Sequence, residues 1–199
     1  MVPMPSSEAL SEQDQLRLLQ LAQDSIQHGL EQGCPLRLEL AHWPQPLQEP
    51  AACFVTLELE GRLRGCIGHL QAIQPLAQDV ADNAFAAAFQ DPRFGPLRAD
   101  ELPRLELHIS VLGEPRPLSF DSEADLIAQL RPGEDGLILQ DGPHRGTFLP
   151  SVWAQLPEPE QFWRQLKRKA GLPADYWSAS LRVQRYSSLG FGRAVTEIQ

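Results

Sequence analysis

Apolar residues recur every three to four positions in three long stretches of the chain, and this spacing predicts three amphipathic helices. The first helix begins after Ser11, which together with Asp14 resembles an N-terminal capping arrangement, and it ends near Gly33. The second and third helices are expected within residues 75–91 and 157–173, because each stretch is bounded by prolines that start or stop a helix.

Alternation of apolar and polar residues predicts strands, in residues 52–59, 62–68, 105–112, 135–150 and 179–188. The first two strands are expected to form a hairpin whose two-residue turn is Gly61-Arg62. The stretch 135–150 is expected to form a second hairpin with a long tip, in which Asp141-Gly142 is the turn signal.

The interleaving of helices and strands predicts an α+β fold, with a mostly antiparallel sheet flanked by helices. A chain of 199 residues suits one domain built from two closely packed lobes. We expect this domain to cover residues 11–199, and residues 1–10 to form a flexible tail.

Composition narrows the functional classes. The net charge of −9 argues against nonspecific nucleic-acid binding, which depends on cationic contacts to phosphates. The sequence has no apolar run of membrane-spanning length and no secretory signal, which favours a cytoplasmic protein. The three cysteines, Cys34, Cys53 and Cys66, show no C-x-x-C spacing. The sequence therefore predicts no metal or cofactor in this chain, and an iron–sulfur cluster would have to be bound by a partner.

The candidate chemistry is in the stretch Arg-Leu-Arg-Gly-Cys-Ile-Gly at 62–68. In a regular strand, one face would carry Leu63, Gly65 and Ile67, and the other would carry Arg62, Arg64, Cys66 and Gly68. A guanidinium beside Cys66 favours a nucleophilic thiolate, and the flanking glycines permit another backbone or a ligand to approach closely. The alternative interpretation is that Cys66 is a small packed residue of the sheet.

A nucleophilic cysteine needs a base, and three histidines are candidates. His69 is three residues after Cys66, His108 shares a strand face with Glu106 and Ser110, and His144 is in the second hairpin. The sequence does not decide among them, although we take His108 as the catalytic candidate. The DPRF stretch at 91–94 is either a helix stop or a presented carboxylate and guanidinium.

Several stretches together resemble the AMMECR family, whose prokaryotic members are also called AmmeMemoRadiSam system protein A. They are, in chain order, GRLRGCIG, NAFAAAFQDPRF, LELHISVL, PGEDGLIL, HRGTFLPSVW and KAGLPADYW. The resemblance covers residues 12–190 and implies an α+β fold with a larger lobe and a smaller second lobe. It also implies two companions, a Memo-like protein and a radical S-adenosylmethionine protein.

The resemblance also implies a site. The family's proposed site block corresponds to Arg64, Gly65, Cys66, Ile67 and Gly68, and further family blocks contain Asp91, Arg93, Arg145 and Lys169. One departure is Gln23, which stands where an arginine is expected in many members.

Two functions follow as hypotheses. In the first, the protein is an enzyme or enzyme subunit that uses Cys66 on a small molecule or peptide, with Arg64 holding the thiolate or an anionic group. In the second, it is a noncatalytic module that recognises a partner protein, or presents a substrate, through the same block. RNA binding is disfavoured by the net charge.

Overall fold

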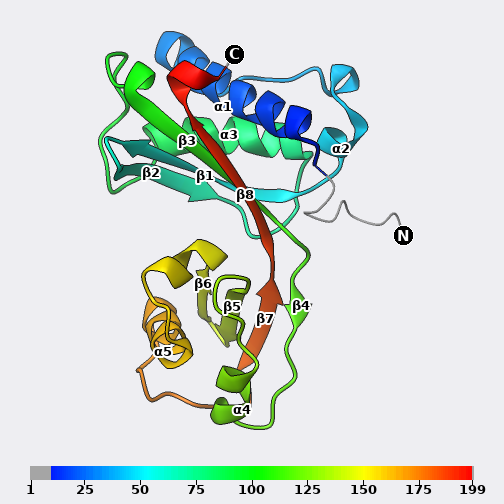
Figure 1. Cartoon of the computed structure of the whole chain (residues 1–199), viewed down its shortest axis with the longest axis vertical. Helices are drawn as coiled ribbons and strands as arrows, with labels where there is room; N and C mark the ends of the chain where they lie inside the picture. The colour runs from blue at the N-terminus through cyan, green and yellow to red at the C-terminus, as the bar shows by residue number, and fades with distance from the viewer. Residues whose placement is uncertain (1–9, 199) are drawn as a thin grey trace. The chain divides into compact units, whose positions relative to one another are not determined.

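The computed structural model describes residues 10–198, and these residues divide into two compact units (Figure 1). The first unit runs from the start of the described chain to Leu112 and resumes at Leu189, and the second is Gly113–Ser188. Nearly all of the predicted N-terminal tail lies outside the described residues. Leu10, which we expected in that tail, is instead buried in the core of the first unit, because its apolar side chain packs there.

The first unit places a four-stranded sheet against helices, in the strand order β2-β1-β3-β8. Its helices and strands are α1 Glu12–Gln32, η1 Leu40–His42, α2 Gln45–Gln48, β1 Ala52–Leu59, β2 Arg62–Gly68, α3 Leu76–Phe89, η2 Leu102–Arg104, β3 Leu105–Leu112, β8 Ser188–Ala194 and η4 Val195–Glu197. Helices α1 and α3 lie side by side, and α3 packs on β1 and β2 (Figure 1). The strand β2 is therefore an edge strand of a sheet that is covered by helices on one face.

Helix α1 begins and ends where the sequence predicts. The hydroxyl of Ser11 accepts a hydrogen bond from the backbone N–H of Asp14, which satisfies one of the free donors of the first turn. Gly33 ends the helix in the left-handed conformation, with φ of 73°, which glycine adopts without steric cost. The buried stripe of α1 includes Leu18 and Ile26, both fully inaccessible to solvent.

Strands β1 and β2 form the predicted hairpin, but the turn and the register differ from expectation. The two turn residues are Glu60 and Gly61, both with positive φ, and Arg62 already belongs to β2. The mirror-image turns that suit hairpin twist need this conformation. A β-bulge follows: Leu57 lies opposite Gly65, whereas Glu58 lies opposite Leu63. Between these two pairs, β2 contains one residue more than β1, namely Arg64.

The second unit is built on its own four-stranded sheet, in the order β4-β7-β5-β6, with α5 packed on β6. Its elements are β4 Arg116–Pro117, α4 Glu123–Ala128, β5 Gly136–Asp141, β6 His144–Phe148, η3 Pro150–Ala154, α5 Pro159–Lys169 and β7 Arg182–Tyr186. The rings of Trp153 and Phe162 stack in its core with centroids 3.8 Å apart. The β5–β6 hairpin is confirmed, but its tip is two residues rather than long.

The predicted α+β class is confirmed, and β1, β2 and β3 pair in an antiparallel manner, as do β4, β5, β6 and β7. The strands form two sheets rather than one. Strand β8 was not predicted, because its glycines at 190 and 192 interrupt apolar alternation. The close packing of the two lobes stays a prediction. Within residues 10–198, no helix has both the length and the apolar character that a bilayer crossing requires.

Candidate functional site

The backbone of Cys66 is held at the free edge of β2 by two side chains of the DPRF stretch. Its N–H donates to Asp91 Oδ2 at 2.9 Å, and its carbonyl accepts from Arg93 Nη2 at 3.3 Å. Asp91 and Arg93 also bind each other, with Nη2–Oδ2 at 2.6 Å and Nε–Oδ1 at 2.9 Å. The two side chains thus act as a short substitute strand, which protects an edge that would otherwise expose unpaired backbone groups.

The charges of this edge are strongly coupled. The hydrogen bonds from Arg93 hold the pKa of the Asp91 carboxyl far below its usual range, and the N–H of Cys66 adds to this effect against the opposing effect of burial. The same pair raises the pKa of Arg93 above its usual value. Asp91 is 4% exposed. The carboxylate of Asp91 is therefore a buried charge, and its ionised form is stabilised by its hydrogen-bond partners.

The side chain of Cys66 lies on the sheet face that points away from α3. Gly65 faces α3, and neighbouring residues of a strand point to opposite faces. Thr56 of β1 is directly opposite Cys66 on one side and His108 of β3 on the other. The three form one row across the sheet, and Thr56 Oγ1 donates to Cys66 Sγ at 3.2 Å.

Polar side chains continue along this face in the neighbouring rows. We call it the polar face of the first sheet, and its members are Thr56, Glu58, Cys66, Glu106, His108 and Ser110. Most are half-buried, and Glu106 is exposed. The opposite face of β1 and β3 carries fully buried apolar residues such as Val55 and Ile109.

Arg64 is the extra residue of the bulge and has no partner on β1, so the regular alternation that predicted its face does not hold at this position. Its Nε and Nη2 bind the two carboxylate oxygens of Glu101 at 2.9 and 3.1 Å, and Nη2 also donates to the carbonyl of Pro96. Its Nη1 is buried without a hydrogen-bond partner. The bidentate pair lowers the pKa of Glu101. The guanidinium beside Cys66 is that of Arg93.

The bulge also reverses the predicted faces of the residues before it. Leu63 was expected in the core, but it lies opposite Glu58 and is 44% exposed. Arg62 was expected on the face of Cys66, but it lies opposite Leu59, on the other face. Simple alternation fails here because the bulge adds a residue that the pattern does not reveal.

The space next to Gly65 and Gly68, the two glycines near Cys66, is occupied by other parts of the chain. A Cβ on Gly65 would lie 2.1 Å from the carbonyl oxygen of Ala87 in α3. A Cβ on Gly68 would lie 2.4 Å from the carbonyl oxygen of Cys53 and from the ring of Phe54. The backbone that approaches these glycines is internal, so they allow tight packing rather than ligand access. Ile67, between them, packs against the core of the first unit.

Of the three candidate histidines, only His108 shares the polar face with Cys66. His69 binds the fully buried carboxylate of Asp79 in α3, with Nδ1 and Oδ1 2.6 Å apart, and so belongs to the helix side of the sheet. His144 is in the second unit, where its Nδ1 is 3.2 Å from the carbonyl oxygen of Ala170. The proposed role of His108 as a base stays a prediction.

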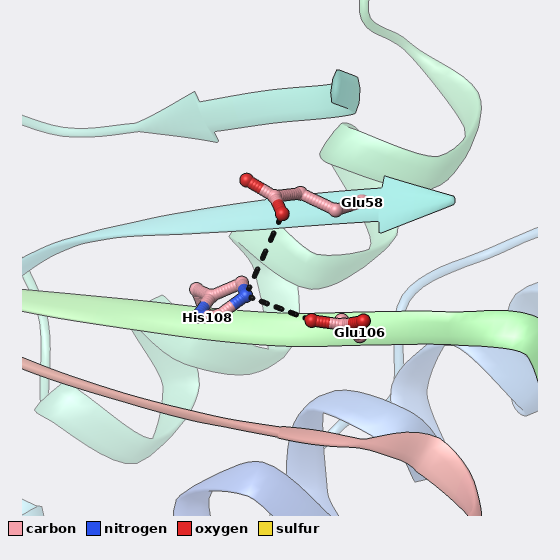
Figure 2. A group of neighbouring side chains, drawn as sticks. All are labelled: Glu58, Glu106 and His108. Carbon is pink, nitrogen blue, oxygen red and sulfur yellow. Dashed lines mark ion pairs between the residues drawn. The ribbon is translucent and has the colours of Figure 1, made fainter. Parts of the chain in front are cut away.

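The imidazole of His108 is directed at two carboxylates. Its Nε2 lies 3.9 Å from Glu58 Oε2 and 3.8 Å from Glu106 Oε2, as Figure 2 shows. Glu58 and Glu106 are directly opposite each other on β1 and β3. The ligand atoms of the three residues all lie within 4.8 Å of one another.

The other two cysteines differ sharply from Cys66. Cys53 is fully buried, and burial together with the nearby Asp79 carboxylate raises the pKa of its thiol well above the usual value. Cys34 is exposed, and its Sγ is 3.6 Å from Nε2 of His28. Cys53 is therefore a packed residue, whereas Cys34 is accessible.

Two predicted binding residues lie in the second unit. Arg145 is an exposed residue of β6 opposite Gln140. Lys169 is the last residue of α5, and its Nζ lies 5.1 Å from the centroid of the Phe148 ring. Both stay predictions as binding residues.

Comparison with known proteins identifies the family of this chain and supports its fold. The model of the AMMECR1 family matches residues 19–191. The chain belongs to the AMMECR1 family. The resemblance inferred from the sequence blocks is thereby confirmed.

Relatives of this AMMECR1 chain are known from archaea. A protein of Methanothermobacter thermautotrophicus is 36% identical over 181 residues, which cover 90% of this chain and 94% of the relative. Protein SSO0193 of Saccharolobus solfataricus is 36% identical over 182 residues, with coverage of 87% and 79%. The crystal structure of uncharacterized protein PH0010 from Pyrococcus horikoshii matches with a TM-score of 0.82 and 31% identity, and covers 89% of this chain and 90% of that one.

Three residues of the candidate site in this AMMECR1-family chain were not singled out from the sequence. Thr56 and Glu58 join the polar face from β1, and Glu101 takes the guanidinium of Arg64. For Thr56 and Glu58 a signal existed, since both alternate with the apolar residues of their strand. For Glu101 no pattern was available, because its contact with Arg64 joins residues 37 positions apart.

Proposed function

We propose that this AMMECR1-family protein is an enzyme, or an enzyme subunit, whose reactive group is the Cys66 thiol. The observation that supports this most directly is the placement of Sγ on the polar face, with a hydrogen bond from Thr56 at 3.2 Å. The backbone of Cys66 is fixed at both its N–H and its carbonyl by Asp91 and Arg93. Such fixation holds a nucleophile in a constant direction, which lowers the entropic cost of reaction.

The surroundings of Sγ suit a thiol nucleophile. A cysteine reacts as the thiolate, and a hydroxyl donor or a nearby cation stabilises negative charge on sulfur. Thr56 supplies the donor, and the guanidinium of Arg93 lies at the carbonyl of the same residue. The substrate class that fits is a small molecule or a peptide with an electrophilic carbon, which Sγ would attack.

We further propose that the protein works with a Memo-like protein and a radical S-adenosylmethionine protein. The support is the resemblance of the sequence blocks to the AMMECR family. An iron–sulfur cluster and S-adenosylmethionine would be bound by the radical S-adenosylmethionine partner, because the three cysteines of this chain lack the spacing of an iron–sulfur ligand set. We place this activity in the cytoplasm, whose reducing conditions keep a reactive thiol free.

The test compares cells whose only copy of the gene encodes the wild-type chain, Cys66→Ala or Cys34→Ala. Untargeted mass spectrometry of small molecules is the readout, with the deletion strain as reference. We expect Cys66→Ala to reproduce the deletion profile, and Cys34→Ala, which removes an exposed thiol, to match the wild type. Circular dichroism of the purified variants establishes that each is folded.

A wild-type profile for a folded Cys66→Ala protein would overturn the proposal. The noncatalytic binding module would then be the better account, and capture of the partner proteins by the same variant would be the next measurement. A bulky residue in place of Gly65 would not test binding cleanly, because a side chain there collides with α3.

A further inference from the structure

A cluster of three potential metal ligands occupies the polar face. The proposed thiol chemistry gives no role to its two glutamates and predicts only that His108 acts as a base. Glu58 comes from β1, and Glu106 and His108 come from β3, where they are two residues apart and share a face. Figure 2 shows a carboxylate oxygen of each glutamate facing the same imidazole nitrogen of His108. Carboxylate oxygen and imidazole nitrogen are both common ligands of divalent metals.

The cluster is unsatisfied within the described chain. His108 Nε2 is a buried atom with no hydrogen-bond partner, since both carboxylates are too distant for a hydrogen bond, at 3.8 and 3.9 Å. Glu58 and Glu106 are like charges directly opposite each other, an arrangement that destabilises a sheet. The ion-pair contact that each glutamate makes within residues 10–198 is with His108. A bound cation would give His108 Nε2 a partner and would offset the repulsion between the two glutamates.

The ring of His108 is fixed from the other side by Gly192 of β8. A Cβ at Gly192 would lie 2.2 Å from His108 Nδ1, so only glycine leaves room for the ring in this position. Nε2 is thereby kept on the side of the carboxylates. The side chains of the three residues are 36–50% exposed, which gives an ion a path from solvent.

We propose that Glu58, Glu106 and His108 bind a divalent transition-metal ion of the zinc type. With metal–ligand distances near ~2.1 Å, tetrahedral geometry separates two ligand atoms by about 3.4 Å. The two distances from His108, 3.8 and 3.9 Å, need to close by about half an ångström, and the two carboxylates already lie within 4.8 Å of each other. An imidazole ligand favours zinc-type ions over magnesium or calcium, which prefer oxygen ligands alone. Three protein ligands leave a fourth position for water or a substrate atom.

This proposal does not rest on the reactivity of Cys66. His108 is in the same row of the sheet as Cys66, and Glu58 and Glu106 are in the next row on the same face, so a substrate bound there could meet both groups. Metal binding is measured without any substrate, and its failure would leave the thiol proposal intact.

The experiment is calorimetric titration of the full, untagged chain with Zn²⁺, supported by visible absorption with Co²⁺. It uses a Cys34→Ser background, because Cys34 and His28 are close enough to capture a metal adventitiously. We expect one ion per chain, at least a hundredfold weaker binding in His108→Ala, and at least a tenfold loss in Glu58→Gln. His42→Ala is the matched control, since His42 is an exposed histidine beside Glu39 of the same unit; its affinity should equal that of the background.

Equal affinity in the background and in His108→Ala would overturn the proposal, as would the absence of binding in the background itself. Because His108→Ala leaves two glutamates opposed, its fold is checked by circular dichroism. If it does not fold, Glu58→Gln removes one charge of the opposed pair, and unchanged Zn²⁺ affinity in that variant would equally refute the site.

Discussion

The carboxylate of Asp91 accepts a hydrogen bond from the backbone N–H of Cys66, at 2.9 Å, and so joins the loop after α3 to the edge of the sheet. Arg93 completes the contact at the carbonyl of the same residue. The DPRF stretch is thus more than a helix stop, because its side chains supply the hydrogen bonds of a missing neighbouring strand. The orientation of the Cys66 thiol therefore depends on Asp91 and Arg93, through their contacts with the backbone of Cys66.

Asp91→Ala should destabilise the first unit by about 2 kcal/mol, because it leaves the N–H of Cys66 and the guanidinium of Arg93 without their partner. Urea unfolding followed by circular dichroism measures the loss. Asp100→Ala is the control, since Asp100 pairs with Arg98 at the exposed surface and its loss should change stability far less. Equal effects of the two substitutions would contradict the structural role of Asp91.

Asp91 should also make stability depend on acid pH. Its pKa is lowered in the folded state, so its contribution is fully present above the unfolded value of about 4 and is lost as pH falls through the lower, folded pKa. The difference in unfolding free energy between wild type and Asp91→Asn should be constant above about pH 5 and should shrink below about pH 4. Denaturant unfolding at a series of pH values measures it, and a difference that grows on acidification would have the wrong sign.

Gly65→Ala should destabilise the protein by about 2 kcal/mol or more, because the added methyl would lie 2.1 Å from the carbonyl oxygen of Ala87, a backbone atom that cannot easily move. The matched substitution is Gly190→Ala, in β8, where an added Cβ meets no atom within 4 Å. Thermal unfolding of both variants is the measurement. If Gly65→Ala is as stable as Gly190→Ala, the packing of α3 against β2 is looser than the structure shows.

The three cysteines should be alkylated in a fixed order in the native protein. Cys34 is exposed and should react first, Cys66 is half-buried and should follow, and Cys53 should stay unmodified until the protein unfolds. Burial raises the pKa of Cys53, so its thiolate is scarce as well as inaccessible. Peptide mass spectrometry after iodoacetamide treatment gives the three rates, and early modification of Cys53 would be incompatible with this core.

Thr56→Val should slow the alkylation of Cys66 by about two- to tenfold, because it removes the hydroxyl that donates to sulfur. Cys34 in the same sample is the internal control and should keep its rate. A rate at Cys66 that is unchanged or faster would show that the Thr56 contact does not activate the thiol, which would weaken the proposed function.

Helix α1 and the strand segments around the site were predictable because their signals are local. Ser11 and Gly33 mark the ends of α1 through their own side chain and backbone conformation. The site was predictable only in part. Cys66 and His108 were placed on sheet faces correctly, but the row that joins them through Thr56 requires the pairing of three strands.

The bulge shows where local reasoning fails. Arg64 was expected beside the thiol because the alternation was extended through the hairpin without interruption. In the folded chain the arginine leaves the ladder and binds Glu101, which is 37 positions away. No sequence pattern in the strand predicts that Arg64 binds Glu101, because the interaction that stabilises this arrangement involves a carboxylate far away in the sequence.

The sequence by itself therefore determined the helices, most strands, the α+β class and the family blocks, since each depends on periodicity or on a short motif. Only the tertiary structure decided that Arg93 rather than Arg64 lies at Cys66, that Gly65 faces α3, and that Glu58, Glu106 and His108 converge. The physical reason is that these relationships depend on register, bulges and strand order. All three are set by packing between segments that are far apart in the chain.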